Sequence, residues 1–261
     1  FTALFFFLYK HYLSEPRWIV ALGLSFAVTG MLYSKYMAVL VVFFVLLSNL
    51  KLLKDCKIWA ALLLAALLFV PHIVWQVQHE FPSFQYHLMD RSSGFDVRHI
   101  LEYVPYQLLV FNPVCLILAF VIIWRNRKTK DLFERACLFM VAGFVLFFFL
   151  MTIKGHVEPH WTVAVSVPMI LVLHRHVQSP EWEKWISRGI VPMVCLVFLC
   201  RILLPVLASE KINIVGNKKK MEAIHAQCGN LPVVFVGSFQ NPSMYRYYTG
   251  ENAVPVSSVY G

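Results

Sequence analysis

Residues 71–107 read PHIVWQVQHEFPSFQYHLMDRSSGFDVRHILEYVPYQ, and this stretch decides how the chain is organised. It leaves one long apolar run and enters another, and between them it mixes acids, bases and aromatic side chains. Its charged residues and histidines after the first run are His79, Glu80, His87, Asp90, Arg91, Asp96, Arg98, His99 and Glu102. A connector between two membrane spans needs only a few polar residues, whereas this mixture is typical of a site that handles a polar substrate. We therefore expect the flanking apolar runs to form a frame that holds this loop at a membrane surface.

Composition defines the class of protein. Of the 261 residues, 59% are hydrophobic and only 14% are charged, and the mean hydropathy is +0.65. That is too little polar surface for a soluble domain of this size, so the sequence predicts a multi-span membrane protein. The net charge of +9 does not indicate nucleic-acid binding, because the basic residues lie in short clusters between apolar runs. The six cysteines form no spaced pairs, so neither a disulfide framework nor a zinc site is predicted.

Eight apolar segments are predicted to cross the membrane as helices, the shorter ones with help from flanking residues or by tilting. They cover approximately residues 1–9, 18–34, 36–50, 57–76, 104–124, 136–153, 161–174 and 189–208. The chain begins inside an apolar run, without an initiator Met or the basic start of a signal peptide, so we expect a fragment of a longer protein. The expected fold is an all-α polytopic membrane domain over residues 1–208.

The composition changes after residue 208, where we expect the start of a soluble α/β domain over residues 209–261. The sequence NKKKMEAIHAQCG predicts a helix that ends at Gly229, and LPVVFVG predicts a buried strand. NPSMYRYYTGENAVPVSS predicts a helix or turn followed by a second strand. No Gly-rich phosphate loop accompanies these elements in the sequence, so no nucleotide site is predicted.

Lysine and arginine in the short connections predict the orientation. Thirteen of these residues lie in one set of connections: two at 10–17, three at 51–57, five at 125–135 and three at 175–188. The alternate connections hold four, which are Lys35, Arg91, Arg98 and Lys154. Cytoplasmic loops carry the excess of positive charge, so the first set is predicted inside and the second outside. Three polar segments, around Lys35, at 77–103 and at 154–160, are thus expected to share the outer face.

Lys35 and Glu158 each allow two interpretations. Lys35, in GMLYSKYMAVL, lies between two apolar runs with hardly a loop to hold it. It either snorkels to the interface or binds a lipid phosphate at headgroup depth. In KGHVEPHW, Pro159 keeps Glu158 out of a regular helix, so its carboxylate can point into a cleft. Alternatively, Glu158 caps the following helix and Trp161 is an interfacial belt residue.

Within residues 71–107, Asp96 is predicted to cap the helix that enters the next span. Trp75 and Gln76 lie where the chain leaves the preceding span. Asp90 and Arg91 form either an ion pair that shapes the loop or a pair that orients a sugar or phosphate. The candidate metal ligands have no recognised spacing, so no metal site is predicted; they are His79, His87, Asp90 and His99.

Three stretches together resemble the bacterial glycosyltransferase family 39 proteins in order and spacing. They are GMLYSKYMAVL, PHIVWQVQHEFPSFQYHLMDR and KGHVEPHWTVAVSVPMIL, and the likeness covers roughly residues 15–175. This family is related to protein mannosyltransferases and to the lipid A aminoarabinose transferase, within the C superfamily of glycosyltransferases. Its S-K-Y turn corresponds to residues 34–36, its P-x-x-x-W-[NQ] exit to residues 71–76 and its E-x-[NH]-W loop to residues 158–161. His160 stands where Asn is commoner in the family.

The resemblance implies inverting transfer of a sugar from a polyprenyl-phosphate carrier to a lipid, glycan or protein acceptor. The reaction would take place on the periplasmic face of the bacterial inner membrane, among membrane lipids, without a metal or other cofactor. The implied substrate-binding residues are Lys35, Tyr36, Trp75, Gln76, His79, His87, Asp90, Arg91, His160 and Trp161. Glu158 is a secondary catalytic candidate, because the family places its principal acid in an outward loop that would precede residue 1.

Two other classes of function are compatible with a multi-span chain. A transporter or flippase for a lipid-linked or polar solute would need ionisable residues at mid-membrane, and often duplicated halves with broken helices. The predicted spans are almost free of charge at their centres, which favours transfer over transport. A membrane acyl- or phosphoethanolamine-type transferase is the third class, and the latter would need a metal-binding soluble domain that the sequence does not indicate.

Overall fold

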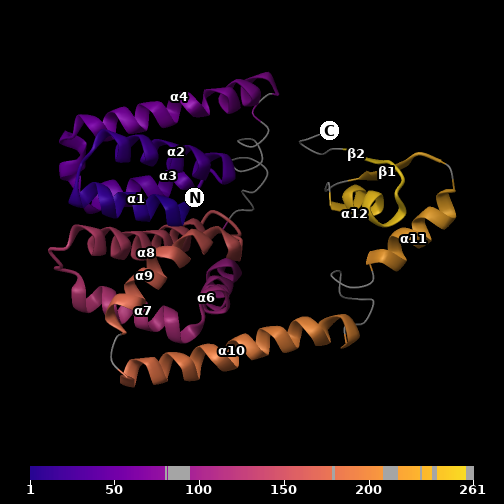
Figure 1. Ribbon diagram of the computed structural model, residues 1–261. Coiled ribbons are helices and arrows are strands. Elements are labelled where there is room, and N and C mark those ends of the chain that lie inside the picture. The colour runs from indigo at the N-terminus through magenta and orange to yellow at the C-terminus, as the bar shows by residue number, and fades with distance from the viewer. Residues whose placement is uncertain are drawn as a thin grey trace. The chain divides into compact units, whose positions relative to one another are not determined.

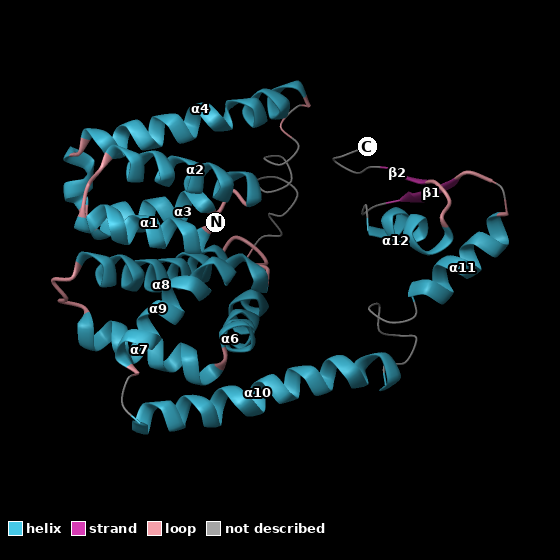
Figure 2. Cartoon of the chain, in the orientation of Figure 1, coloured by secondary structure: helices cyan, strands magenta, loops and turns pink. Residues whose placement is uncertain are grey.

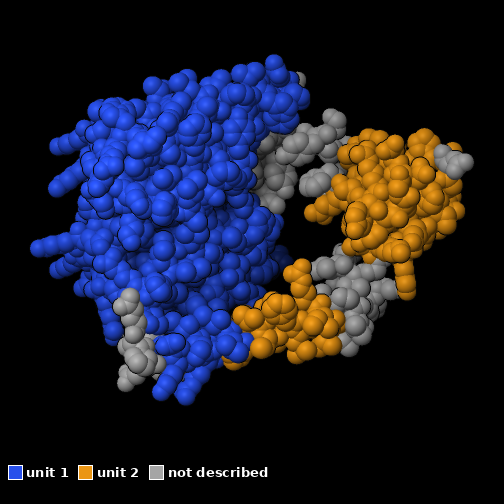
Figure 3. Space-filling view, in the orientation of Figure 1, with its two compact units in different colours: residues 1–81, 87–191 blue, residues 82–86, 192–261 orange. Residues whose placement is uncertain are grey.

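The computed structural model describes residues 1–79, 81, 95–177, 180–207, 217–229, 231–236 and 240–256, and it is mostly helical (Figure 2). The chain divides into two compact units, residues 1–81 with 87–191 and residues 82–86 with 192–261 (Figure 3).

Unit 1 consists of helices joined by short connections (Figure 1). They are α1 (Thr2–Ser14), α2 (Trp18–Ser34), α3 (Ala38–Ser48), the 3₁₀ helix η1 (Leu50–Lys54), α4 (Cys56–Gln78), α6 (Val97–Phe111), α7 (Pro113–Asn126), α8 (Leu132–Met151), the 3₁₀ helix η3 (Pro159–Val165), α9 (Ser166–His176) and the first part of α10 (Pro180–Leu207). Each of the eight predicted apolar segments coincides largely with one or two of these helices.

Three helical segments among the described residues are long and apolar enough to cross a membrane, namely Cys56–Gln78, Leu132–Met151 and Ile186–Leu203. The bent pair α6 and α7 makes a fourth if it is counted as one span. The helices α2 and α3 are apolar but shorter. These lengths and compositions agree with the predicted helical membrane protein, since a hydrocarbon layer of about 30 Å needs about 20 helical residues.

Three aspartates begin helices in unit 1 by accepting hydrogen bonds from backbone N–H groups. Asp55 accepts from the Lys57 N–H at 2.9 Å at the start of α4. Asp96 accepts from the Arg98 N–H at 2.8 Å, which confirms the predicted cap of α6. Asp131 accepts from the first turn of α8 in the same way. Each bond satisfies a donor that the helix itself leaves unpaired.

Helix α8 forms the centre of unit 1. In its most apolar stretch of 18 residues, half of the residues are buried. The corresponding share is 17% in α4, and no residue is buried in the stretch Ile186–Leu203. Ala136, Met140, Phe144 and Phe148 follow at intervals of four residues and are at most 1% exposed, so they form one buried face. Helix α3 packs closely against α8 at Gly143, where an added Cβ would lie 2.4 Å from the Phe44 ring.

The predicted segment 104–124 is divided in two, because α6 and α7 meet at an angle of 99°. The bend is at Asn112, which adopts a positive φ of 64° just before Pro113. Its Oδ1 accepts from the Val114 N–H at 3.0 Å and so caps α7. Its Nδ2 donates to the Gly189 carbonyl at 3.2 Å, which ties the bend to the start of α10.

Unit 2 contains a small α/β arrangement after the end of α10. Its elements are α11 (Asn217–Cys228), β1 (Val233–Val236), α12 (Gln240–Thr249) and β2 (Ala253–Val256), in the order that the sequence predicts. The strands are parallel, with Val233 opposite Ala253, and α12 is the crossover between them. Met221 and Tyr245 fill the core between helices and sheet and are at most 1% exposed.

Candidate functional site

The segments predicted to lie inside meet at one end of unit 1. The Tyr12 hydroxyl at the end of α1 donates to Asp55 Oδ2 at 2.5 Å, before α4. Arg175, near the end of α9, donates to Asp131 Oδ2 at 2.6 Å, before α8. Lys10 lies 5.7 Å from the centre of the Phe133 ring. Four predicted inner connections are therefore in contact with one another, as a shared face requires.

The predicted outer segments around Lys35 and at 154–160 meet directly. Lys35 lies between α2 and α3 in extended backbone and donates from Nζ to the His160 carbonyl at 3.2 Å. Its side chain is exposed, yet desolvation by the surrounding protein holds the pKa of the ammonium below its ordinary value. The contact joins residues 125 positions apart in the chain.

A groove of about 620 Å³ opens beside this contact. Ser34, Lys35, His160 and Trp161 contribute polar groups beside the contact, and Thr2 and Ser166 contribute two more hydroxyls elsewhere in the lining. The remainder is mainly apolar, from the start of α1, the end of α2, the start of α3, η3 and α9; it includes Ala3, Met31, Ala38, Val41, Val163 and Val167. The groove therefore combines a lysine with a mainly apolar lining, a composition that suits an amphiphile with an anionic head.

Glu158 is near this groove in the chain but does not line it. It occupies the N-cap position of η3 with φ −68° and ψ 134°, so Pro159 does keep it out of a helix, as predicted. Its side chain forms no capping hydrogen bond, which argues against the capping interpretation. The carboxylate is partly exposed, and its backbone carbonyl accepts from the Trp161 N–H at 3.0 Å.

A hydrogen-bonded cluster joins Tyr36 to the last turns of α4. Gln76 is 2% exposed and donates from Nε2 to the Tyr36 hydroxyl at 2.8 Å. That hydroxyl lies 2.5 Å from His72 Nε2, to which it can donate. Trp75 stacks between His72 and His79, with ring centres 5.9 and 4.6 Å away. The predicted residues Tyr36, Trp75, Gln76 and His79 are thus brought together, and His72 joins them.

His72 is a site residue that sequence reasoning missed. The signal was available, because His72 precedes Gln76 by four residues and therefore shares its helix face. The aromatic rings of Phe69 and Tyr33 also pack around His72, with ring centres 5.0 and 5.8 Å from that of His72. A partly buried imidazole in contact with a hydroxyl and an amide is well placed to orient Tyr36, which follows Lys35 directly.

The start of α6 packs against the segment 154–160. The His99 and His156 rings lie 5.7 Å apart, and His156 Nδ1 is 3.8 Å from Glu102 Oε2. Deeper in the same interface, the Thr162 hydroxyl donates to Gln107 Oε1 at 2.7 Å, and both side chains are at most 2% exposed. This buried bond fixes η3 against α6 and so positions the turn that carries His160.

Three predicted substrate-binding residues, His87, Asp90 and Arg91, lie outside the described residues. Their proposed roles, including the Asp90 and Arg91 pair, stay predictions. Within the described part of the chain, no group of three or more His, Cys, Asp or Glu side chains could hold a metal ion.

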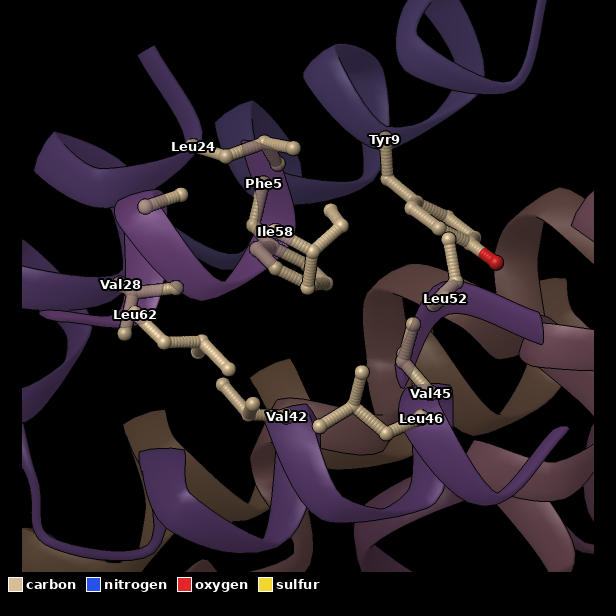
Figure 4. Close-up of a pocket in the computed structure, with 11 residues that line it drawn as sticks. Phe5, Tyr9, Leu24, Val28, Val42, Val45, Leu46, Leu52, Ile58 and Leu62 are labelled. Carbon is tan, nitrogen blue, oxygen red and sulfur yellow. The ribbon is translucent and has the colours of Figure 1, made fainter. Parts of the chain in front are cut away.

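A small apolar cavity lies among α1, α2, α3, η1 and α4 (Figure 4). Its volume is only about 40 Å³, and aliphatic and aromatic side chains line it. A dry cavity of this kind is a packing feature and cannot bind a polar substrate.

No family model matches the chain, and neither the curated proteins nor the solved structures include one that is significantly similar to it. The resemblance to glycosyltransferase family 39 therefore stays a prediction from the three motifs.

Proposed function

We propose that the chain is the membrane part of a glycosyltransferase that moves a sugar from a polyprenyl-phosphate carrier to a lipid, glycan or protein acceptor. We place the reaction on the periplasmic face of a bacterial inner membrane. The observation that supports this most strongly is the groove beside the Lys35 to His160 contact. It combines an ammonium group with a mainly apolar lining, which suits a lipid phosphate.

Lys35 suits the phosphate because its ammonium has three donors and the described contacts use one of them, toward the His160 carbonyl. Desolvation already penalises the charge of this group, so a phosphate beside it would gain more Coulomb energy than in bulk water. The apolar side chains of Met31, Ala38 and Val41 would contact the first isoprene units of the carrier.

The hydrogen-bonded cluster on α4 offers what a sugar needs. Trp75 is 38% exposed and offers aromatic surface to a sugar, while the hydrogen bond from buried Gln76 holds the Tyr36 hydroxyl beside His72. We assign Glu158 the role of orienting the sugar or acceptor, because it lies two residues before His160 but is not part of the groove wall.

The distribution of ionisable residues supports transfer over transport. From Ala136 to Met151, α8 carries no acidic or basic residue, and α4 carries none between Lys57 and His72. A transporter would need such groups near the middle of the membrane. In unit 1 the described outer polar groups gather at one end, where a lipid headgroup would lie.

We further propose that all eight apolar segments cross the membrane. The 3₁₀ helix η3 continues directly into α9. At about 2.0 Å per residue in η3 and about 1.5 Å in α9, the two together reach about 30 Å, enough for one span. The shorter helices α1, α2 and α3 would be completed by tilt and by their flanking residues.

Binding of undecaprenyl phosphate to the purified protein tests the proposal directly. Lys35→Gln should weaken binding about tenfold or more, because a charge-assisted hydrogen bond contributes about 1.5–3 kcal/mol. The matched control is Lys154→Gln, which removes an exposed lysine of the same predicted face that does not line the groove. Equal affinities for wild type and Lys35→Gln, or equal losses in both variants, would contradict the phosphate role of Lys35.

A further inference from the structure

A second groove lies at the opposite end of unit 1, where α3, α7 and α8 meet. Its volume is about 320 Å³, and its apolar lining includes Phe44, Leu47, Ile123, Leu138, Ala142 and Leu146. Leu47 and Leu146 are 43% and 58% exposed, so the groove is open along its length. In a protein that crosses a membrane, such an opening faces the lipid.

Two arginines close one end of this groove. Arg127 caps α7 and Arg135 lies in the first turn of α8, and both line the groove. Arg127 lies over the Trp124 ring, 4.6 Å from its centre, and donates to the Trp124 carbonyl at 2.6 Å. The Nε of Arg135 is buried and has no hydrogen-bond partner among the described residues.

Arg175 has carboxylate partners, which Arg127 and Arg135 lack within the described part of the chain. Arg175 forms an ion pair with Asp131 at 2.6 Å and lies 3.8 Å from Glu134. Within the described part of the chain, neither Arg127 nor Arg135 forms an ion pair with a carboxylate. Two guanidinium groups without a carboxylate, at the end of an apolar groove, favour an anionic ligand with a hydrocarbon chain.

The length of the groove fits one leaflet of a bilayer. From Arg135 to Leu146, helix α8 rises eleven residues, or about 16 Å. Half of a hydrocarbon layer of about 30 Å is about 15 Å. The arginines lie in the connection that the positive charge places in the cytoplasm, so their end of the groove coincides with the inner headgroup layer.

We propose that this groove binds one anionic phospholipid of the cytoplasmic leaflet. Its phosphate would contact Arg127 and Arg135, and one acyl chain would lie along α8 between α3 and α7. This site is independent of the proposed transfer reaction, because it lies at the other end of unit 1 and shares no lining residue with the groove at Lys35.

Native mass spectrometry of the purified protein, with phosphatidylglycerol and phosphatidylcholine as probes, tests the proposal. We expect one phosphatidylglycerol to be retained in preference to phosphatidylcholine. Arg127→Gln with Arg135→Gln should lower that retention about tenfold or more, because both direct charge-assisted contacts with the phosphate are lost. Lys128→Gln with Lys130→Gln removes the same charge from neighbouring exposed positions and should leave retention unchanged.

A second variant tests the apolar part without changing charge. Ala142→Trp fills the groove and should abolish retention of phosphatidylglycerol, whereas Leu150→Trp, on an exposed part of α8 outside the groove, should not. If the double arginine variant does not fold, Arg127→Gln alone replaces it, because Arg127 is exposed. Equal retention of both lipids by wild type, or equal losses in the lysine and arginine variants, would overturn the proposal.

Discussion

Glu158 and Lys35 belong to segments that meet, yet only Lys35 lines the groove. Glu158 is held in extended backbone before Pro159, with a partly exposed carboxylate that forms no capping bond. A general base must lie within hydrogen-bond reach of the hydroxyl that it deprotonates. The position beside the groove instead favours a carboxylate that accepts hydrogen bonds from the sugar or the acceptor.

Substitutions of Glu158 distinguish these roles in transfer assays on membrane-inserted protein. If Glu158 orients, Glu158→Gln keeps the shape and hydrogen bonding and should retain appreciable transfer, while Glu158→Ala should lose much more. If it is the base, both variants should lose about 10²–10⁴-fold, the usual contribution of general-base catalysis. Equal and near-complete losses would therefore refute the orienting role, and two wild-type rates would remove Glu158 from the site.

The Tyr36 hydroxyl is the centre of the cluster on α4, because both His72 and buried Gln76 contact it. Tyr36→Phe removes this hydroxyl and costs Gln76 one acceptor, so it should destabilise the protein by about 1–3 kcal/mol. Tyr33→Phe is the matched control, since the Tyr33 hydroxyl is exposed and donates only to the Leu68 carbonyl at 3.2 Å. Thermal unfolding should show a lower Tm for Tyr36→Phe than for Tyr33→Phe. Equal Tm values would contradict the prediction that the Tyr36 hydroxyl stabilises the protein.

At the scale of elements, the apolar runs of the sequence predict the helices well, because burial in lipid or protein requires continuous backbone hydrogen bonding. The bend at Asn112 was not predicted. The Asn112–Pro113 pair signals a break, since a residue before proline avoids helical backbone, but the apolar run continues across it. Hydropathy alone cannot separate one straight span from two helices at 99°.

Close packing of α3 on α8 depends on Gly143, which leaves room for the Phe44 ring. Gly143→Val should destabilise the protein by about 1–3 kcal/mol, because overpacking forces the ring and the helices apart. Gly23→Val is a milder control, since a Cβ there would lie 3.1 Å from the end of the Leu8 side chain. Unfolding in a denaturing detergent should rank wild type, Gly23→Val and Gly143→Val in decreasing stability; an unaffected Gly143→Val would contradict the close approach.

At the scale of the whole molecule, alternation of basic and neutral connections predicts which segments share a face. The contacts of Lys35 with His160 and of Arg175 with Asp131 agree with that division. The particular contacts were not predictable, because 125 residues separate Lys35 from His160 and charge patterns carry no information on how spans pack. The prediction also placed His99 and Glu102 on the outer face without indicating that His156 would contact them.

Cysteine labelling with a membrane-impermeant reagent tests this topology, in a protein whose six cysteines have been replaced. Gly155 belongs to the predicted outer turn but is buried, so its exposed neighbour Lys154 is the better position for the outer label. Lys128, exposed after α7, is the matching inner position. The excess of positive charge predicts that Lys154→Cys is labelled in intact cells and Lys128→Cys only after permeabilisation. Labelling of Lys128→Cys from outside would reverse the orientation, move the groove at Lys35 to the cytoplasmic face and contradict both proposed lipid sites.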